Sequence, residues 1–198
     1  MESNSWDQLP LDQLEREYSP SSLAPDFLLT IKRYQALSAQ VLPDHVKRIA
    51  YGAHPDEFVL LHVADLLTVN AAANLPAYKP TWEASKKSTA QSAENISKPE
   101  SKQITKQTSE QSATLVFIHG GYWQELSALD SMFGARAIGC LGINWAAINY
   151  GLAPTVSLDV IVQRCKLALM ALAKRNSKTR FVLAGSSAGA HQAGVCHE

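Results

Sequence analysis

The feature that most constrains this chain is a glycine and serine motif set between a strand pattern and a helix pattern. Residues 181–184 form a short apolar run typical of a buried strand, and residues 190–193 can continue as a helix. Between them lies G-x-S-x-G at 185–189, in which glycines permit a strained turn and a close approach of helix to sheet. A tight glycine and serine turn without a chemical role is the alternative. The strand before and the helix after favour a nucleophile elbow with Ser187 exposed at its tip.

Strand and helix patterns alternate through the second half of the chain. Strands are predicted at 114–118, 143–148 and 181–184, with helices within 126–138 and over 157–173. Such alternation implies right-handed βαβ crossovers and a mainly parallel sheet covered by helices on both faces. The sequence therefore predicts an α/β fold.

The first half adds a helix and a hairpin. Apolar positions recur at helical spacing after the N-cap residue Asp26 and stop at Pro43: Leu28, Ile31, Tyr34, Leu37 and Val41. They predict an amphipathic helix that packs on something larger. Residues 46–51 and 58–67 read as strands joined by a turn, which would make a hairpin.

Length and composition indicate one domain with an insertion. A chain of 198 residues that is 46% hydrophobic can bury a single core, so residues 1–198 are expected to form one partial domain. Residues 83–112 are rich in Ser, Thr, Lys, Gln, Glu and Ala, with Ile96 and Ile104 as the large apolar residues. We expect a disordered surface insertion there, because such a segment buries too little surface to offset its ordering entropy. A docking or phosphorylation segment is the functional alternative.

Net charge, targeting signals and histidine spacing indicate which partners, location and metals to expect. Eighteen basic and eighteen acidic residues leave no net charge, which disfavours nucleic acid and membrane surfaces as partners. Without a leader-like or membrane-spanning stretch, a cytoplasmic location with reduced cysteines is expected. No metal site is indicated, because the remaining histidines show no ligand spacing: His45, His54, His62, His191 and His197.

A second motif, H-G-G-Y-W at 119–123, follows the predicted strand 114–118. A loop there can turn backbone N–H groups toward Ser187, because the two strands are expected to be neighbours in such a sheet. The amides of Gly121 and Tyr122, with that of Ala188, would then stabilise the negative oxygen of a tetrahedral intermediate. Gly120 allows a substrate carbonyl to approach the main chain.

The other two residues of this motif have alternative interpretations. His119 precedes the serine, whereas a fold with such a nucleophile elbow supplies its base after the serine, so a structural histidine that braces the loop is favoured over a base. Trp123 is either a flat wall for an aromatic substrate or core packing, and the sequence leaves both open. His191, one turn into the helix after Ser187, is interpreted as a buried structural histidine.

Together these segments resemble the arylformamidase (kynurenine formamidase) branch of the α/β-hydrolases, whose hallmark is HGGYW or HGGxW. The N-terminal stretch of this branch is similar to L-E-R-E-Y-S-P-S at 14–21, and its Y-G-x-A-P turn is similar to Y-G-L-A-P at 150–154. Leu158-Asp159 opens the next helix in the same way. G-S-S-A-G-A-H at 185–191 is similar to its G-H-S-A-G-A-H, with Ser186 in place of histidine.

The resemblance implies a serine hydrolase that converts N-formyl-L-kynurenine to kynurenine and formate, with a small formamide or acyl substrate and no cofactor. A homo-oligomer is compatible with it. In this fold the triad acid and histidine follow the serine, and eleven residues follow Ser187 here, so we expect a truncated chain with little activity. A general carboxylesterase and a non-catalytic truncated product are the competing hypotheses.

Overall fold

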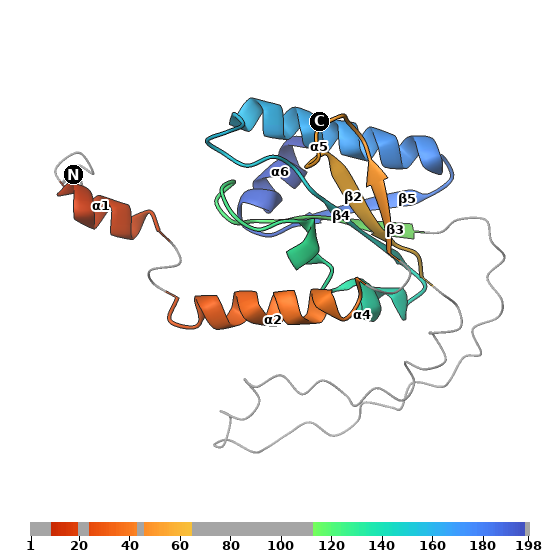
Figure 1. Cartoon of the computed structure of the whole chain (residues 1–198), viewed down its shortest axis with the longest axis horizontal. Helices are drawn as coiled ribbons and strands as arrows, with labels where there is room; N and C mark the ends of the chain where they lie inside the picture. Colours follow the sequence, from red (N-terminus) through yellow and green to blue (C-terminus); the bar gives the residue numbers. More distant parts are fainter. Residues whose placement is uncertain (1–8, 20–23, 43–45, 65–112, 197–198) are drawn as a thin grey trace, which may run out of the picture.

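The computed structural model describes residues 9–19, 24–42, 46–64 and 113–196 (Figure 1). The insertion predicted at 83–112 and the end of the strand predicted at 58–67 lie outside these residues. The elements in chain order are α1 (Leu11–Glu17), α2 (Phe27–Ala39), β1 (Val46–Ala50), β2 (Phe58–His62), β3 (Ala113–Ile118), the 3-10 helix η4 (Ala128–Ser131), α4 (Ala135–Gly139), β4 (Asn144–Ile148), α5 (Leu158–Arg175), β5 (Arg180–Gly185) and α6 (Ala188–Cys196).

One sheet joins all five described strands, in the order β1-β2-β4-β3-β5. β3 pairs in parallel with both β4 and β5, so the strands that precede the two sequence motifs are neighbours, as predicted. The predicted hairpin forms, and β2 also pairs antiparallel with β4. The α/β class is therefore confirmed, but the described sheet is mixed rather than mainly parallel, because the hairpin extends it.

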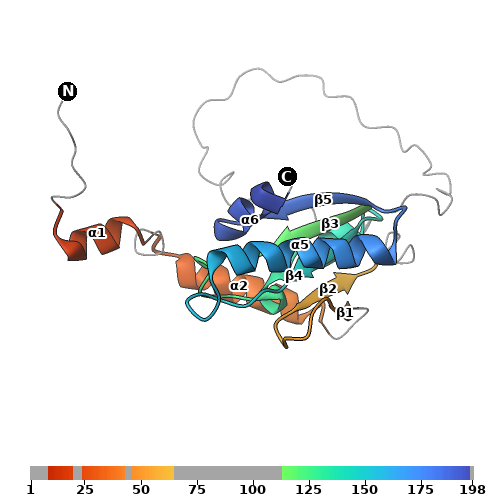
Figure 2. The ribbon, with the colours of Figure 1, turned by 90° about the horizontal axis from the view of Figure 1, so that it is seen from above.

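Side chains alternate between two core clusters, one on each face of the sheet. Val116, Ile118 and Ile148 contribute to the first cluster, which α5 covers and α6 flanks (Figure 2). Leu60, Trp145 and Ala147 contribute to the second, with the end of α2, η4 and α4 against it. Because successive residues of a strand point to opposite faces, both layers are specified by the same strands. Within the described part, no helix is long and apolar enough to cross a bilayer.

The helix predicted within 126–138 is divided into η4 and α4. Ser127 caps η4 by accepting a hydrogen bond from the Leu129 amide at 3.2 Å. Between the two helices lies Gly134, where a Cβ would stand 2.5 Å from the Trp145 ring. The close approach of a core indole to the backbone explains why a glycine interrupts the helical pattern.

The packing face predicted for α2 is partly wrong. Leu28 is 72% exposed and Leu37 is 46% exposed, whereas Phe27, Ile31 and the adjoining Val41 are turned inward. Residues repeated every three positions drift around a helix of 3.6 residues per turn, so Leu28 and Leu37 fall on opposite flanks of the inward face. Spacing alone did not identify the residues that face the sheet.

β5 is an edge strand in the described sheet. Val182 at its centre is 49% exposed. Beside the strand, a groove of about 700 Å³ is lined by apolar side chains of β5, α5 and α6, among them Met170, Phe181 and Leu183. An exposed strand edge with apolar flanks pairs readily with another chain.

We expect Val182→Lys to raise the soluble, monomeric fraction of the chain several-fold, because a lysine on an edge strand opposes strand addition. Light scattering coupled to size-exclusion chromatography measures that fraction. Val160→Lys on α5 is the matched control, since Val160 is 42% exposed but lies off the edge. Equal gains from both variants would show that added charge, not the edge, controls association.

Candidate active site

The turn between β5 and α6 holds Ser187 in a strained, exposed conformation. Ser187 has φ 52°, in the left-handed region that few non-glycine residues adopt, and its side chain is exposed. Its carbonyl accepts hydrogen bonds from the amides of Ala190 at 2.9 Å and His191 at 3.2 Å, which start α6 immediately after it. Strain of this kind persists where the surrounding structure enforces it. The serine thus stands at the tip of a sharp strand-to-helix turn, as the motif predicted.

Close backbone contacts hold this turn against the end of β3. The Ser186 amide donates to the Ile118 carbonyl at 3.3 Å. A Cβ on Gly189 would overlap the carbonyl oxygens of Ile118 and His119, and one on Gly120 would lie 2.6 Å from the Ser186 oxygen. The absence of these side chains lets residues 119–121 pack directly against the Ser187 turn.

The loop after β3 is itself tightly wound. Gly121, Tyr122 and Trp123 have φ values of 99°, 53° and 61°. The Gly121 carbonyl accepts hydrogen bonds from the amides of Gln124 and Glu125, both at 2.9 Å. In the described part of the chain, the amides of Gly121, Tyr122 and Ala188 donate to no carbonyl or side chain. The loop and the start of α6 therefore offer three unused N–H groups near Ser187.

His119 supports this loop from its buried side. It is 1% exposed, and its ring stacks on Tyr150 with a centroid distance of 4.1 Å and an interplanar angle of 4°. The Tyr150 hydroxyl donates to the His119 carbonyl at 2.8 Å, and the His119 Nδ1 lies 2.8 Å from the Gly120 carbonyl. Since a carbonyl only accepts, Nδ1 carries the proton and donates. These contacts agree with the structural interpretation of His119.

Burial lowers the pKa of His119 from 6.5 to about 4, partly opposed by the hydrogen bond to Gly120. Between pH 6.5 and about pH 4, the unfolded chain therefore binds a proton at this histidine and the folded chain does not. The free energy of unfolding has its full value above pH 6.5 and falls progressively as the pH is lowered to about 4. We expect a loss of about 3 kcal/mol in the free energy of unfolding over that range.

Urea denaturation at several pH values measures this loss. His119→Gln should flatten the dependence between pH 6.5 and 4, although the variant is less stable throughout. His54→Gln is the control, because His54 is an exposed histidine in the β1–β2 turn. A slope that survives in His119→Gln would contradict the assignment.

The structure separates the two interpretations of Trp123. Its indole packs against the first core cluster and meets the His191 ring edge-on at 5.7 Å. Trp123 is not among the residues that line the cavity beside Ser187. Core packing is therefore the better description.

The burial predicted for His191 is wrong, because α6 turns Ala188, Gly189 and Gln192 inward and leaves His191 exposed.

A cavity of about 580 Å³ opens beside Ser187, and His119, Gly120, Gly121 and Tyr122 also line it. Residues of α1, α2, η4 and the segment between η4 and α4 also line it. Sequence motifs did not indicate these residues, because their positions depend on how the N-terminal helices dock. The described residues include no group of three or more histidine, cysteine or carboxylate side chains placed to hold a metal.

Asn149 is a further residue that sequence reasoning missed. It is 5% exposed at the end of β4, where its Oδ1 accepts from the Ala128 amide at 3.0 Å and its Nδ2 donates to the Asp56 carbonyl at 2.9 Å. It joins the hairpin turn to the start of η4. A polar residue directly after a buried strand was the available signal.

Sequence comparison finds similar proteins among the kynurenine formamidases. A kynurenine formamidase of Salmo salar is 34% identical over 82 residues, which are 41% of this chain and 28% of that protein. A kynurenine formamidase of Danio rerio is 24% identical over 194 residues, which are 97% of this chain and 55% of that protein. The chain is arylformamidase-like in sequence and has the α/β-hydrolase fold. It spans about half the length, or less, of these relatives. No protein-family profile matches it.

Solved structures share the fold of this arylformamidase-like chain. A protein of Silicibacter sp. TM1040 with a provisional thioesterase assignment aligns with a TM-score of 0.60 at 21% identity, over 90% of this chain and 53% of that one. Esterase B of Lactobacillus rhamnosis aligns with a TM-score of 0.50 at 18% identity, over 90% of this chain and 47% of that one. At these identities the likeness establishes the α/β-hydrolase fold.

Proposed function

We propose that the protein is a serine hydrolase of the arylformamidase type, acting on the formamide of N-formyl-L-kynurenine. The observation that carries the proposal is the exposed, strained Ser187 beside a loop whose Gly121 and Tyr122 amides have no hydrogen-bond partner in the described part. The kynurenine formamidases of two fish are similar in sequence, which favours this reaction over others of the fold.

In this mechanism the Ser187 oxygen attacks the formyl carbon and its proton passes to a base. The carbonyl oxygen becomes an oxyanion, which the amides of Gly121, Tyr122 and Ala188 stabilise by hydrogen bonds. The carbon–nitrogen bond then breaks, and the arylamine leaves with the proton as kynurenine. Water hydrolyses the formyl-serine ester to release formate and regenerate the hydroxyl.

The general carboxylesterase is the alternative, because esterase B has the same fold. Formate release from N-formylkynurenine is compared with hydrolysis of a short aryl ester, using a form of the protein extended to the length of its relatives. A higher kcat/KM for the formamide supports the proposal. A higher kcat/KM for the ester would favour the alternative.

The base is proposed to lie outside residues 1–198. No described histidine is hydrogen-bonded to the Ser187 hydroxyl, and His119 is committed to the Gly120 carbonyl and to stacking on Tyr150. The 198-residue chain alone should therefore turn over on the order of a millionfold more slowly than a complete triad enzyme. Purified chain that releases formate at enzymic rates would contradict this and would locate the base within it.

A further inference from the structure

The charged side chains that line the cavity beside Ser187 are acidic. Three carboxylates line it, from Glu15 on α1, Glu125 on the loop after β3 and Asp130 on η4, and no lysine or arginine does among the described residues. His119 in the same wall adds no positive charge near neutral pH, because burial lowers its pKa to about 4. The wall of the cavity is therefore acidic, although the whole chain has no net charge.

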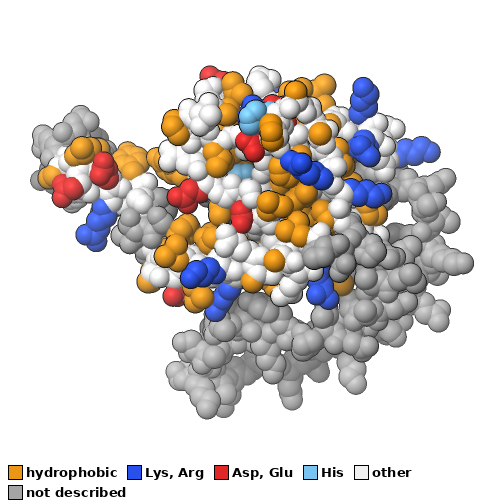
Figure 3. All heavy atoms as spheres, in the orientation of Figure 1, with side chains coloured by type: hydrophobic (Ala, Val, Ile, Leu, Met, Phe, Trp, Pro, Cys, Tyr) orange, Lys and Arg blue, Asp and Glu red, His pale blue; other side chains and the backbone are white. Residues whose placement is uncertain are grey.

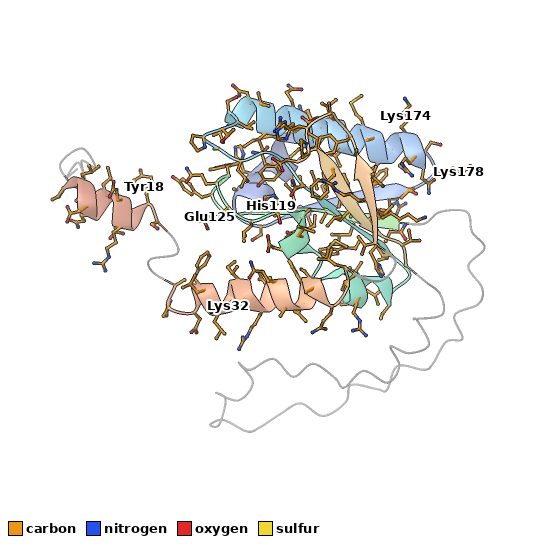
Figure 4. The ribbon with its side chains drawn as sticks, in the orientation of Figure 1. Tyr18, Lys32, His119, Glu125, Lys174 and Lys178 are labelled. Atoms are coloured by element: carbon orange, nitrogen blue, oxygen red, sulfur yellow. The ribbon has the colours of Figure 1, made fainter. Side chains whose placement is uncertain are left out.

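The described lysines lie outside the cavity lining. In Figure 4, Glu125 lies near His119, whereas Lys32 projects from the side of α2 that faces away from the sheet and Lys174 and Lys178 stand at the far end of α5. Figure 3 shows acidic side chains on the α1 side of this face and basic ones along α2 and toward the end of α5, although α1 also carries a basic side chain. Among the described residues, no lysine or arginine lines the cavity where it could neutralise these carboxylates.

Aromatic rings form much of the remaining wall. Tyr34 stacks on Phe133 with centroids 4.4 Å apart and an interplanar angle of 16°, and Phe117 meets Phe133 edge-on at 5.4 Å. Tyr122, which is 55% exposed, borders the cavity beside Ser187. Aromatic faces carry partial negative charge and attract ammonium groups, an attraction that acidic neighbours reinforce.

Glu125 is held in place for such a role. Its amide donates to the Gly121 carbonyl at 2.9 Å, which fixes it to the loop that carries the unused amides. No described residue forms an ion pair or a hydrogen bond with its carboxylate. The Asp130 carboxylate, by contrast, already accepts from Gln35 and Ser127. Glu125 is thus a carboxylate at the cavity that lacks a counter-charge.

We propose that this cavity selects aromatic ligands that carry an ammonium group, with Glu125 as the residue that recognises the positive charge and the aromatic wall as the support for the ring. The proposal rests on the proposed function only in assigning the substrate to this cavity. A cationic substituent on the leaving arylamine would then lie against the acidic wall. A ligand whose negative charge is not balanced by a positive charge would bind less tightly.

The test is binding to the 198-residue chain, without hydrolysis. Three probes share a phenyl group and differ in charge, namely 2-phenylethylamine, 2-phenylethanol and 3-phenylpropionate, and calorimetry at low salt measures their affinities. We expect the amine to bind on the order of tenfold more tightly than the alcohol, and the carboxylate to bind most weakly. Equal affinity for all three, or the tightest binding for the carboxylate, would overturn the proposal.

Glu125→Gln should weaken amine binding about three- to fivefold and leave alcohol binding unchanged. Unchanged alcohol binding also verifies that the variant is folded. Glu17→Gln, at the exposed end of α1 and outside the cavity lining, is the matched control and should change nothing. If Glu125→Gln leaves amine binding intact, Glu125 is not the recognition residue. Because no bond is broken, selective binding can succeed where formate release fails, and the two proposals are judged separately.

Discussion

Ser187→Ala is expected to lower turnover on the order of a millionfold in a form of the protein extended to the length of its relatives. The hydroxyl is the proposed nucleophile, and no other described serine or threonine combines a left-handed backbone, an exposed side chain and neighbouring unused amides. Residual hydrolysis would come from binding and oxyanion stabilisation alone. Fluorophosphonate labelling and formate release measure the loss, since both require an activated serine.

Ser186→Ala is the control for this experiment. Ser186 is also exposed and also lines the cavity, and its carbonyl accepts a hydrogen bond from the Gly189 amide at 2.9 Å, which the substitution keeps. It should retain most labelling. Equal labelling of Ser187→Ala and the unsubstituted protein would show that the nucleophile has been assigned wrongly.

Gly189→Ala is expected to abolish cooperative folding or to destabilise the chain by roughly 3 kcal/mol or more. The added Cβ would overlap the carbonyl oxygens of Ile118 and His119, which are backbone atoms at the end of β3 and cannot rotate away. To accommodate the methyl group, α6 would have to move off the sheet and displace Ser187. Thermal unfolding by circular dichroism, with the soluble yield, measures the effect.

Gly194→Ala on the same helix separates this contact from general helix effects. A Cβ on Gly194 would meet nothing within 4 Å. Because alanine favours a helix by about 1 kcal/mol over glycine, this variant should be neutral or slightly more stable. If both variants unfold alike, the close contact of Gly189 with β3 is not what holds α6 in place.

Local sequence was sufficient for most elements of the fold. The apolar runs before Gly185 and His119 become β5 and β3, and Ser157 caps α5 through its hydroxyl. Strand and helix periodicity depends on residues close in the chain, which is why it can be read without a structure. The pairing of β3 with β5 followed from the two motifs having to meet, and the structure has that pairing.

The sequence by itself therefore determined the α/β class, the Ser187 turn and the glycines that let the two motifs approach. Tertiary structure alone decided that the hairpin joins the sheet through β2, that Leu28 and Leu37 face outward, and that Trp123 packs in the core instead of lining the cavity. It also brought Glu15 and Tyr34 to the same cavity as Ser187. These outcomes depend on contacts between segments that lie far apart in the chain, and no local period encodes which faces of distant elements meet.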